Sequence, residues 1–510
     1  MLVTQRTGGI VLSVKKLFRS RWSWVGLSSV VVTGVYLPLV LQESAWSDDY
    51  PLLGPNQDLE KVFQDGRPIW AVIFRLLFPD RVESLGLLRA IGVLGTALLI
   101  GYLTHLLIKW GTSGALSVLV AVSVGLLPPF HGYVGWATTF VLPWVSLAGG
   151  IAGIAWVDGV SERHWKSSVV AMLAMVGALL CYPPAAMFCW GLLGLRMVAR
   201  PMPLRRSLYE AGSLATLSVL AGLIAVATAA VVNLAKGLET HERVGIVSSP
   251  GEAVEKLVWF ATRPVVVAAR PFQISSPGNL EALLTGGSVL IVIAIGLYLR
   301  GEGSPAARAR WVVLCGLVAA LSMISHLLSH DNQIEYRFML GLTVAVWGYL
   351  VFSLKSIALA VTSTHRCRSA QRHLPLVGST VLTIIVFLAG WAARENVKDT
   401  FIDPYTKKVV YLEQALTAFD SELYSRVIVI NDPNGWPSRK NVGIFSTVSD
   451  LAHPWVVEPN VRQVLSDLGI DVEGIAVLIF DAPPERGHQG YELDLRLYIA
   501  DHLEPNLNPR

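Results

Sequence analysis

The sequence predicts an α-helical polytopic membrane protein with about eleven transmembrane helices and a small C-terminal α/β domain outside the membrane. Three observations lead to this fold class. Of the 510 residues, 53% are hydrophobic and only 15% are charged, whereas soluble globular proteins carry about 25% charged residues. Mean hydropathy is +0.52, and long apolar runs recur as far as residue 393. Beyond that point charged residues are spread throughout the sequence, which indicates a change of environment.

A helix needs about 20 largely apolar residues to cross the hydrocarbon core of a bilayer. The first such run follows a basic N-terminal segment without a convincing cleavage site, so we expect it to be retained as a transmembrane helix. Pro183 and Pro184 interrupt the fifth and sixth runs, which could be two spans or one kinked element with a re-entrant piece. The predicted spans are 23–41, 84–108, 113–130, 138–158, 167–183, 185–199, 210–234, 281–300, 311–329, 338–358 and 375–393.

The distribution of Lys and Arg between the loops predicts the orientation of the chain. If the N-terminus is cytoplasmic, basic residues fall in the loops that would face the cytoplasm, and the short opposite loops near His131 and Tyr182 contain none. The basic residues are Lys109, Arg163, Lys166, Arg196, Arg200, Arg205, Arg206, Arg300, Arg308, Arg310, Arg366, Arg368 and Arg372. We therefore expect a multi-pass protein of a bacterial inner membrane, with a cytoplasmic N-terminus and a periplasmic C-terminal domain.

This topology divides the chain into a transmembrane domain, 1–395, and a soluble domain, 396–510. Two outer loops of the transmembrane domain, 42–83 and 235–280, face the same side as the soluble domain. Extended apolar runs and segments of helical spacing predict an α/β fold for the soluble domain. The runs are 426–430, 475–480 and 493–499, and the helical segments are 407–424 and 459–469. No Gly-rich phosphate loop follows the first two runs, and a net charge of +4 gives no indication of nucleic acid binding.

Part of the first outer loop is apolar again. Residues 68–78 are too few to span a membrane, and Pro68 suits the first turn of a helix. Trp70 and Arg75 suit the level of the lipid headgroups. We expect a helix that lies in the membrane interface, and residues 251–262 could form a second one.

The first outer loop also carries a carboxylate pair, Asp48 and Asp49, directly after the first predicted span. Acids so close to a membrane segment are costly unless they are used or paired. One carboxylate can accept a proton from an attacking hydroxyl while the other orients it. Trp46 and Tyr50 flank the pair as candidate sugar-stacking rings, and Asp65 follows where the loop returns to the interfacial helix. The alternative is a solvated, acidic loop end without a catalytic role.

Four arginines on the predicted outer side are candidates for binding a phosphate. The planar guanidinium matches phosphate oxygens, and positive charge stabilises a phosphate leaving group. These arginines are Arg67, Arg263, Arg270 and Arg337. Arg337 is the most interesting because it lies at the mouth of an apolar span. A salt bridge to Asp331 or Glu335, or a role as an anchor at the membrane interface, is the alternative.

Three further residues, His131, Tyr182 and Tyr336, lie on the same predicted face and could line a substrate pocket, or could simply order their loops. His326 and His330 are four residues apart, so one helix face could present both to a metal ion. The spacing fixes no third ligand. We therefore predict no cofactor, and a divalent metal is not indicated.

Three features together resemble a polytopic glycosyltransferase of the GT-C class, which uses lipid-linked sugars. They are a first helix followed by an outer loop with an Asp pair, an interfacial helix, and a bundle of further spans. The chain is more closely similar to the bacterial O-antigen-modifying type II glucosyl transferases over most of 25–395. The similarity rests on Ser47–Tyr50, Asp65–Pro68, the Pro-aromatic loop 128–133, Tyr182, and Tyr336–Arg337. Two segments depart from that family: 131–136 lacks an Arg–Asp element, and Pro183 and Pro184 stand where Gln or Ala is expected.

The resemblance implies a donor that carries a sugar, glucose by this likeness, on polyprenyl phosphate at the outer face of the membrane. The acceptor would be a cell-surface glycan such as the O-antigen of lipopolysaccharide. Asp48 or Asp49 would be the general base of an inverting transfer, and an outer arginine would hold the phosphate. Two other functions stay open: a transporter or flippase of lipid-linked saccharides, and a scaffold whose soluble tail binds envelope partners. A transporter would show internal repeats and polar groups at mid-membrane, and the sequence shows neither clearly.

Overall fold

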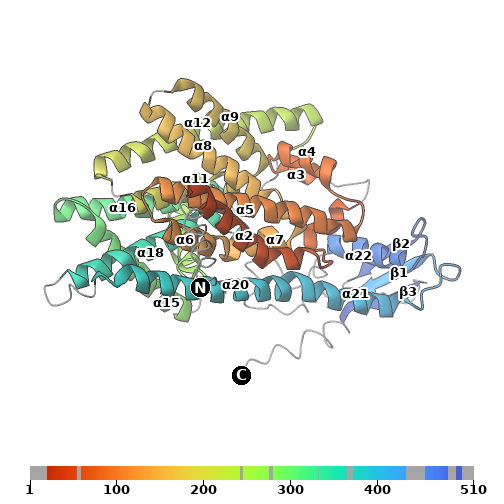
Figure 1. The fold of residues 1–510 in the computed structure, drawn as a ribbon. Coiled ribbons are helices and arrows are strands. Elements are labelled where there is room, and N and C mark those ends of the chain that lie inside the picture. Colours follow the sequence, from red (N-terminus) through yellow and green to blue (C-terminus); the bar gives the residue numbers. More distant parts are fainter. Residues whose placement is uncertain are drawn as a thin grey trace, which may run out of the picture.

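The computed structural model shows a bundle of long helices that carries a small parallel sheet at one end (Figure 1). The structure describes residues 20–53, 59–162, 164–200, 202–239, 241, 245–274, 280–330, 332, 334–363, 371–431, 454–480 and 490–496. The helices of the first half are α2 (Arg21–Val40), α3 (Glu60–Gln64), α4 (Pro68–Leu77), α5 (Leu85–Lys109), α6 (Gly114–Gly125), α7 (Pro128–Gly135), α8 (Leu142–Glu162), α9 (Trp165–Cys181), α10 (Pro183–Ala186), α11 (Phe188–Ala199) and α12 (Leu204–Lys236). The helices that follow are α13 (Pro250–Thr262), α14 (Pro264–Ala268), α15 (Leu280–Arg300), α16 (Pro305–Leu321), α17 (Ile324–Leu328), α18 (Leu340–Thr362) and α20 (Leu374–Val397). Four 3₁₀ helices connect them: η1 (Ser47–Leu52), η2 (Val82–Ser84), η3 (Ala137–Thr139) and η5 (Tyr336–Phe338).

Capping and small residues explain how the first two long helices form and pack. Helix α2 begins after Ser20, whose hydroxyl accepts the backbone N–H of Trp22 at 3.3 Å and so satisfies a donor that the first helical turn leaves open. Along its length α2 packs against α5, where Ser29 donates to the carbonyl of Ala97 at 2.8 Å. A Cβ atom on Gly101 would lie 2.7 Å from the Ser29 hydroxyl. Only a glycine allows the two backbones to approach this closely.

Within the described residues, seven helices are long and apolar enough to cross a membrane, or eight if α6 and α7 form one span. The axes of α6 and α7 differ by 61°, because Pro128 lacks an N–H and starts a new helix. Two shorter elements, α9 and α10–α11, correspond to the fifth and sixth predicted spans. The ninth predicted span, 311–329, is broken: the 17-residue α16 ends at Leu321 and the short helix α17 follows. Pro183 and Pro184 separate α9 from α11, where the sequence predicts a break. A total of about eleven spans therefore stays a prediction.

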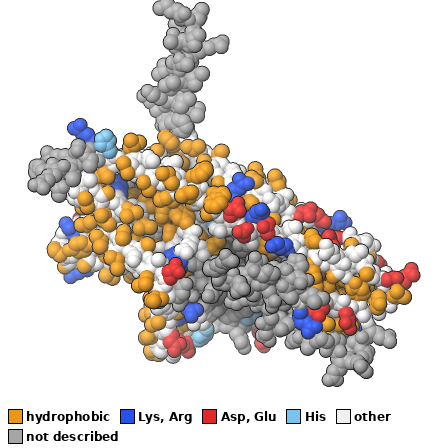
Figure 2. Space-filling model, turned by 90° about the horizontal axis from the view of Figure 1, so that it is seen from below, with side chains coloured by type: hydrophobic (Ala, Val, Ile, Leu, Met, Phe, Trp, Pro, Cys, Tyr) orange, Lys and Arg blue, Asp and Glu red, His pale blue; other side chains and the backbone are white. Residues whose placement is uncertain are grey.

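The outside of the bundle is hydrophobic. Figure 2 shows hydrophobic side chains over the helical body and acidic side chains gathered toward the end that carries the sheet. On α12, Leu223 is 64% exposed and Val226 is 68% exposed, and on α20 Phe387 is 76% exposed. Broad apolar surface is unfavourable in water, whereas helices with satisfied backbones suit a lipid environment.

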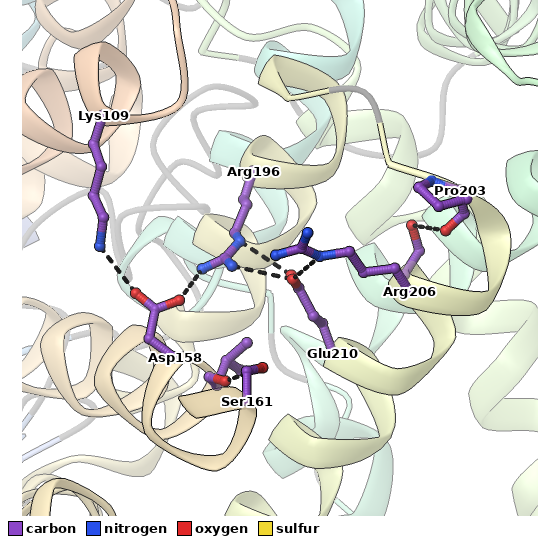
Figure 3. A network of polar contacts seen from close by, with 9 residues as sticks. Lys109, Asp158, Ser161, Arg196, Pro203, Arg206 and Glu210 are labelled. Carbon is purple, nitrogen blue, oxygen red and sulfur yellow. Dashed lines mark hydrogen bonds and ion pairs between the residues drawn. The ribbon is translucent and has the colours of Figure 1, made fainter. Parts of the chain in front are cut away.

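An ion network links four helices near the start of α12 (Figure 3). Asp158 of α8 binds Lys109 of α5 at 3.0 Å and Arg196 of α11 at 2.7 Å. Arg196 also binds Glu210 of α12 at 3.0 Å, and Glu210 accepts from Arg206 at 3.1 Å. Glu210 and Arg196 are almost fully buried, so each needs the other to compensate its charge. The sequence predicts that three of these residues, Lys109, Arg196 and Arg206, face the cytoplasm.

Three segments that the sequence predicts on one side of the membrane meet near the opposite end of α12, called the loop end here. The ammonium of Lys236, at the end of α12, lies 4.2 Å from the ring of Phe63 in α3. The backbone N–H of His241 donates to Gln64 at 3.2 Å. The C-terminal segment reaches the same place, because α22 (Pro454–Asp467) packs against η1. The structure thus joins the first outer loop, the 235–280 segment and the C-terminal segment.

The C-terminal segment continues from α20 through the π-helical turn η7 (Lys398–Ile402) into α21 (Asp403–Leu416) (Figure 1). Three parallel strands follow in the spatial order β2-β1-β3. They are β1 (Arg426–Ile430), β2 (Ala476–Phe480) and β3 (Tyr491–Asp494). A separate apolar core joins α21 and α22 to the sheet through Leu412, Val429 and Val461.

The strands and helices of this segment lie close to the predicted ones. The predicted strands 426–430 and 475–480 correspond to β1 and β2. The third predicted strand, 493–499, overlaps only the end of β3, which runs from Tyr491 to Asp494. Residues 497–499 of the predicted run lie outside the described residues. Helix α21 stops at Leu416 rather than at 424, and α22 begins five residues before the predicted start.

Candidate functional site

The loop after α2 places Asp48 and Asp49 in different environments. Asp49 is fully buried, and its two carboxylate oxygens accept the backbone N–H groups of Trp46 and Thr138, each at 2.8 Å. Burial raises the pKa of Asp49 to about 7, against the two backbone donors, which lower it. Asp49 therefore ties the first outer loop to η3. Asp48 is half-buried, and the preceding Ser47 has a left-handed φ of +42°, a strained conformation for a serine.

Arg89 of α5 supports the same loop from the other side. It is buried and donates to the hydroxyl of Ser44 at 2.8 Å, to the carbonyl of Ser44, and to the carbonyl of Gln42 at 2.5 Å. The sequence reasoning missed this residue. The available signal was an arginine near the start of the apolar run 84–108, because a charged residue in a membrane segment marks a functional or structural contact.

Arg337 lies at the loop end, where it interacts electrostatically with Asp48. Its guanidinium forms an ion pair with the buried carboxylate of Glu335, which is one of the two salt bridges considered from the sequence. It also lies 4.7 Å from the ring of Trp136 and 5.0 Å from that of Phe338. Burial opposes the charge of Arg337, but the acids Glu335 and Asp48 outweigh it and raise the pKa of the guanidinium. A cation, a half-buried acidic residue and aromatic faces thus lie in one region.

Tyr182 and Arg67 extend this region. The guanidinium of Arg67 lies 4.7 Å from the ring of Tyr182 and 3.5 Å from the carboxylate of Asp65. The Tyr182 ring meets Trp70 edge to face at 4.9 Å and stacks on Phe338 at 6.3 Å. Tyr182 is fully buried, yet its hydroxyl has no hydrogen-bond partner among the described residues. A buried hydroxyl without a partner costs free energy unless a ligand or water satisfies it.

His326 and Lys256 lie in the same region, although the sequence did not identify them as candidates for phosphate binding. The ring of His326 lies 4.4 Å from that of Phe338, and Lys256, Arg67 and Arg337 all act on it electrostatically. Lys256 is buried on α13. We call Arg67, Lys256 and Arg337 the basic cluster. The signal for Lys256 was its place in the apolar segment 251–262.

His326 and His330 do not share one helix face, which the four-residue spacing had left open. Helix α17 ends at Leu328, and the next residue pairs with Ile246 in an isolated β-bridge. His330 therefore lies off the helix face that carries His326, and its Nδ1 lies 3.4 Å from Glu252. No group of three or more potential metal ligands occurs in the described parts of the chain. Asp331 lies outside them.

The remaining predicted residues occupy other places at the loop end. The side chain of Arg270 is buried and donates to that of Gln273 at 3.1 Å, while the Gln273 carbonyl accepts from the Tyr336 hydroxyl at 3.2 Å. Arg263 is exposed between α13 and α14. His131 is buried, with its Nε2 3.0 Å from the carbonyl of Leu126 at the break between α6 and α7.

The two aromatic residues beside the acid pair make packing contacts rather than an open stacking platform. Trp46 is 1% exposed, and its ring meets that of Phe401 edge to face at 5.5 Å. Tyr50 is 3% exposed, and its hydroxyl accepts a hydrogen bond from Lys408 at 2.6 Å. A stacking role for either ring would require these contacts to separate.

These features define an α-helical, multi-pass membrane protein, in which apolar helices form the lipid-facing body and polar groups gather at the loop end. A scan against models of known protein families finds no match, and a search of curated proteins finds none either.

Proposed function

We propose that this protein is a membrane glycosyltransferase that moves a sugar from a polyprenyl-phosphate donor to a cell-surface glycan. The observation that carries the proposal is that Asp48 and Arg337, both half-buried, interact electrostatically, while the Arg337 guanidinium lies against the rings of Trp136 and Phe338. Arg67 and Tyr182 lie in the same region. An acid that accepts a proton and a cation that stabilises a leaving phosphate are the two groups that such a transfer needs.

Asp48 is the better candidate for the base. Both carboxylate oxygens of Asp49 accept backbone hydrogen bonds inside the protein, so this side chain holds the loop. In the proposed reaction, Asp48 accepts the proton of an acceptor hydroxyl, and the hydroxyl oxygen attacks the anomeric carbon of the donor. The bond between that carbon and the phosphate oxygen breaks with inversion, and the phosphate leaves with its electron pair. Arg337 and Arg67 stabilise its negative charge.

The amphipathic helix α4 supports a donor that is attached to a lipid. Trp70 and Phe74 on one face of α4 are buried, whereas Val72 and Leu76 are 52% and 74% exposed. A short helix with one apolar exposed face suits the membrane interface, where the phosphate of a polyprenyl lipid would lie. We place this face on the periplasmic side of a bacterial inner membrane, with glucose as the transferred sugar and O-antigen as the acceptor class.

Replacement of Asp48 by Asn tests the proposal. The rate of sugar transfer from radiolabelled polyprenyl-phosphate glucose to an acceptor glycan should fall by about 10²- to 10⁴-fold, because the base is lost. Asp80 is exposed in the same outer loop, so Asp80→Asn is a matched control that should transfer at the wild-type rate. Wild-type transfer by Asp48→Asn, at equal amounts of folded protein, would reject the assignment of the base.

A transporter or flippase of lipid-linked saccharides is the second candidate. The break between α6 and α7, with its 61° bend, favours it, because interrupted membrane helices form substrate sites in many transporters. Movement of a labelled lipid-linked saccharide across sealed proteoliposomes, without transfer of its sugar, would decide for this function.

A further inference from the structure

The C-terminal segment buries a lysine against the loop that carries Asp48. We call residues 44–53 the Asp48 loop. Lys408 of α21 is 1% exposed and Tyr50 of the loop is 3% exposed. The Lys408 ammonium donates to the Tyr50 hydroxyl at 2.6 Å and lies 4.3 Å from the centre of its ring. A buried ammonium is costly unless it is hydrogen-bonded, so the hydrogen bond to Tyr50 helps to keep the Lys408 charge inside the protein.

A second contact to the Asp48 loop comes from the π-helical turn η7. Phe401 in this turn is fully buried, and its ring meets that of Trp46 at a centroid distance of 5.5 Å. A Cβ atom on Gly135 of α7 would clash with the same ring. The ring of Trp136, the residue after Gly135, lies 4.7 Å from the guanidinium of Arg337 in the basic cluster. Phe401 therefore packs between the Asp48 loop and the segment that supports the basic cluster.

Helix α22 joins the cores of the two parts of the molecule. Val456 belongs to the large apolar core of the helical bundle. Its neighbours Val457 and Val461 belong to the separate core beneath the sheet. Because α22 also packs against η1, the sheet and its helices cannot leave the bundle without exposing apolar surface next to the Asp48 loop.

We propose that the C-terminal segment holds the Asp48 loop in its working conformation, with Lys408 and Phe401 as the positioning residues. Neither side chain has a part in the chemistry of the proposed transfer. They act through Tyr50 and Trp46, which flank the acid pair in sequence. The effect on transfer rests on the proposed function, whereas the effect on the loop does not.

Amide hydrogen exchange of the full chain in lipid nanodiscs tests the proposal without any need for activity. Lys407, the exposed neighbour of Lys408, provides the matched control Lys407→Met. In Lys408→Met, the amides of 46–52 should exchange at least about tenfold faster than in the control, because a buried charge-assisted hydrogen bond is lost. Amides of α12 and β1 should keep their protection, which distinguishes a local effect from loss of the fold.

Unchanged exchange over 46–52 in Lys408→Met would overturn the proposal. If this variant does not fold, Tyr50→Phe tests the same hydrogen bond from the other side, because it removes only the phenolic oxygen. The same local increase is then expected, and wild-type exchange in the loop would again reject the positioning role.

Transfer assays separate this inference from the proposed function. If both hold, Lys408→Met lowers kcat more than it raises KM for the donor, and Lys407→Met changes neither. If the wild type transfers no sugar while Lys408→Met still loosens the Asp48 loop, the proposed function fails and the positioning role stands.

Discussion

Asp49 should make the stability of the protein depend on pH in a window set by its own titration. Its pKa rises from 3.8 to about 7 on burial. Between these values the folded protein keeps a proton at Asp49 that the unfolded chain has released, so the free energy of unfolding falls as the pH rises. Below about pH 4 both states are protonated, and above about pH 7 both are ionised, so the dependence ends at each limit. A shift of about three pKa units at 1.36 kcal/mol each corresponds to about 4 kcal/mol across the window.

Asp49→Asn provides the comparison, because its side chain has nearly the same shape and does not titrate. Relative to Asp49→Asn, the wild type should lose free energy of unfolding as the pH rises from 4 to 7. Above pH 7 the difference between the two proteins should stay constant. Denaturant unfolding in one detergent at several pH values measures this difference. Equal slopes for the wild type and Asp49→Asn would refute the argument that burial controls this carboxyl.

Three further predictions concern the basic cluster and the ion network. Arg337→Lys should lower the transfer rate at least about 100-fold, measured with labelled donor, because an ammonium does not reproduce the guanidinium geometry; a wild-type rate would exclude Arg337 from the site. Tyr182→Phe should leave the thermal unfolding midpoint unchanged or raised, because its hydroxyl has no hydrogen-bond partner in the described structure. It should also raise KM for the donor, and an unchanged KM would mean that the hydroxyl does not contact the donor. Arg196→Leu should reduce the free energy of unfolding by about 3–5 kcal/mol, because Glu210 is left buried with less compensating charge. The double variant Arg196→Leu/Glu210→Leu should be more stable than Arg196→Leu alone, because no unpaired carboxylate is then buried.

The sequence identified the loop end more completely than it identified the roles of its residues. Apolar runs locate the long helices because a bilayer requires about 20 apolar residues for each span. The Asp pair was visible as well. The sequence did not show that Asp49 holds the loop while Asp48 stays available, because the backbone donors to Asp49 come from Trp46 and from Thr138, 89 residues away. Distant contacts of this kind leave no periodicity in a single sequence.

Two other arrangements could not be predicted from the sequence, and both have local causes. His326 and His330 have helical spacing, but the helix ends between them, and no capping residue in the sequence indicated this. Trp46 and Tyr50 are aromatic residues beside acids, which is typical of sugar sites. Their partners, Phe401 and Lys408, lie in a part of the chain that the sequence analysis treated as a separate domain.

The hydrogen bond between Tyr50 and Lys408 joins residues 358 positions apart, and this separation has a consequence for biosynthesis. At about 5–20 residues per second, a ribosome needs about 20–70 s to reach Lys408 after it has made Tyr50. During that interval the early helices can enter the membrane, but the Asp48 loop lacks its partners from the C-terminal segment. A chain that stops before α21 would therefore hold the Asp48 loop only through early contacts, such as those of Thr138 and Arg89, and would lack the contacts from Phe401 and Lys408.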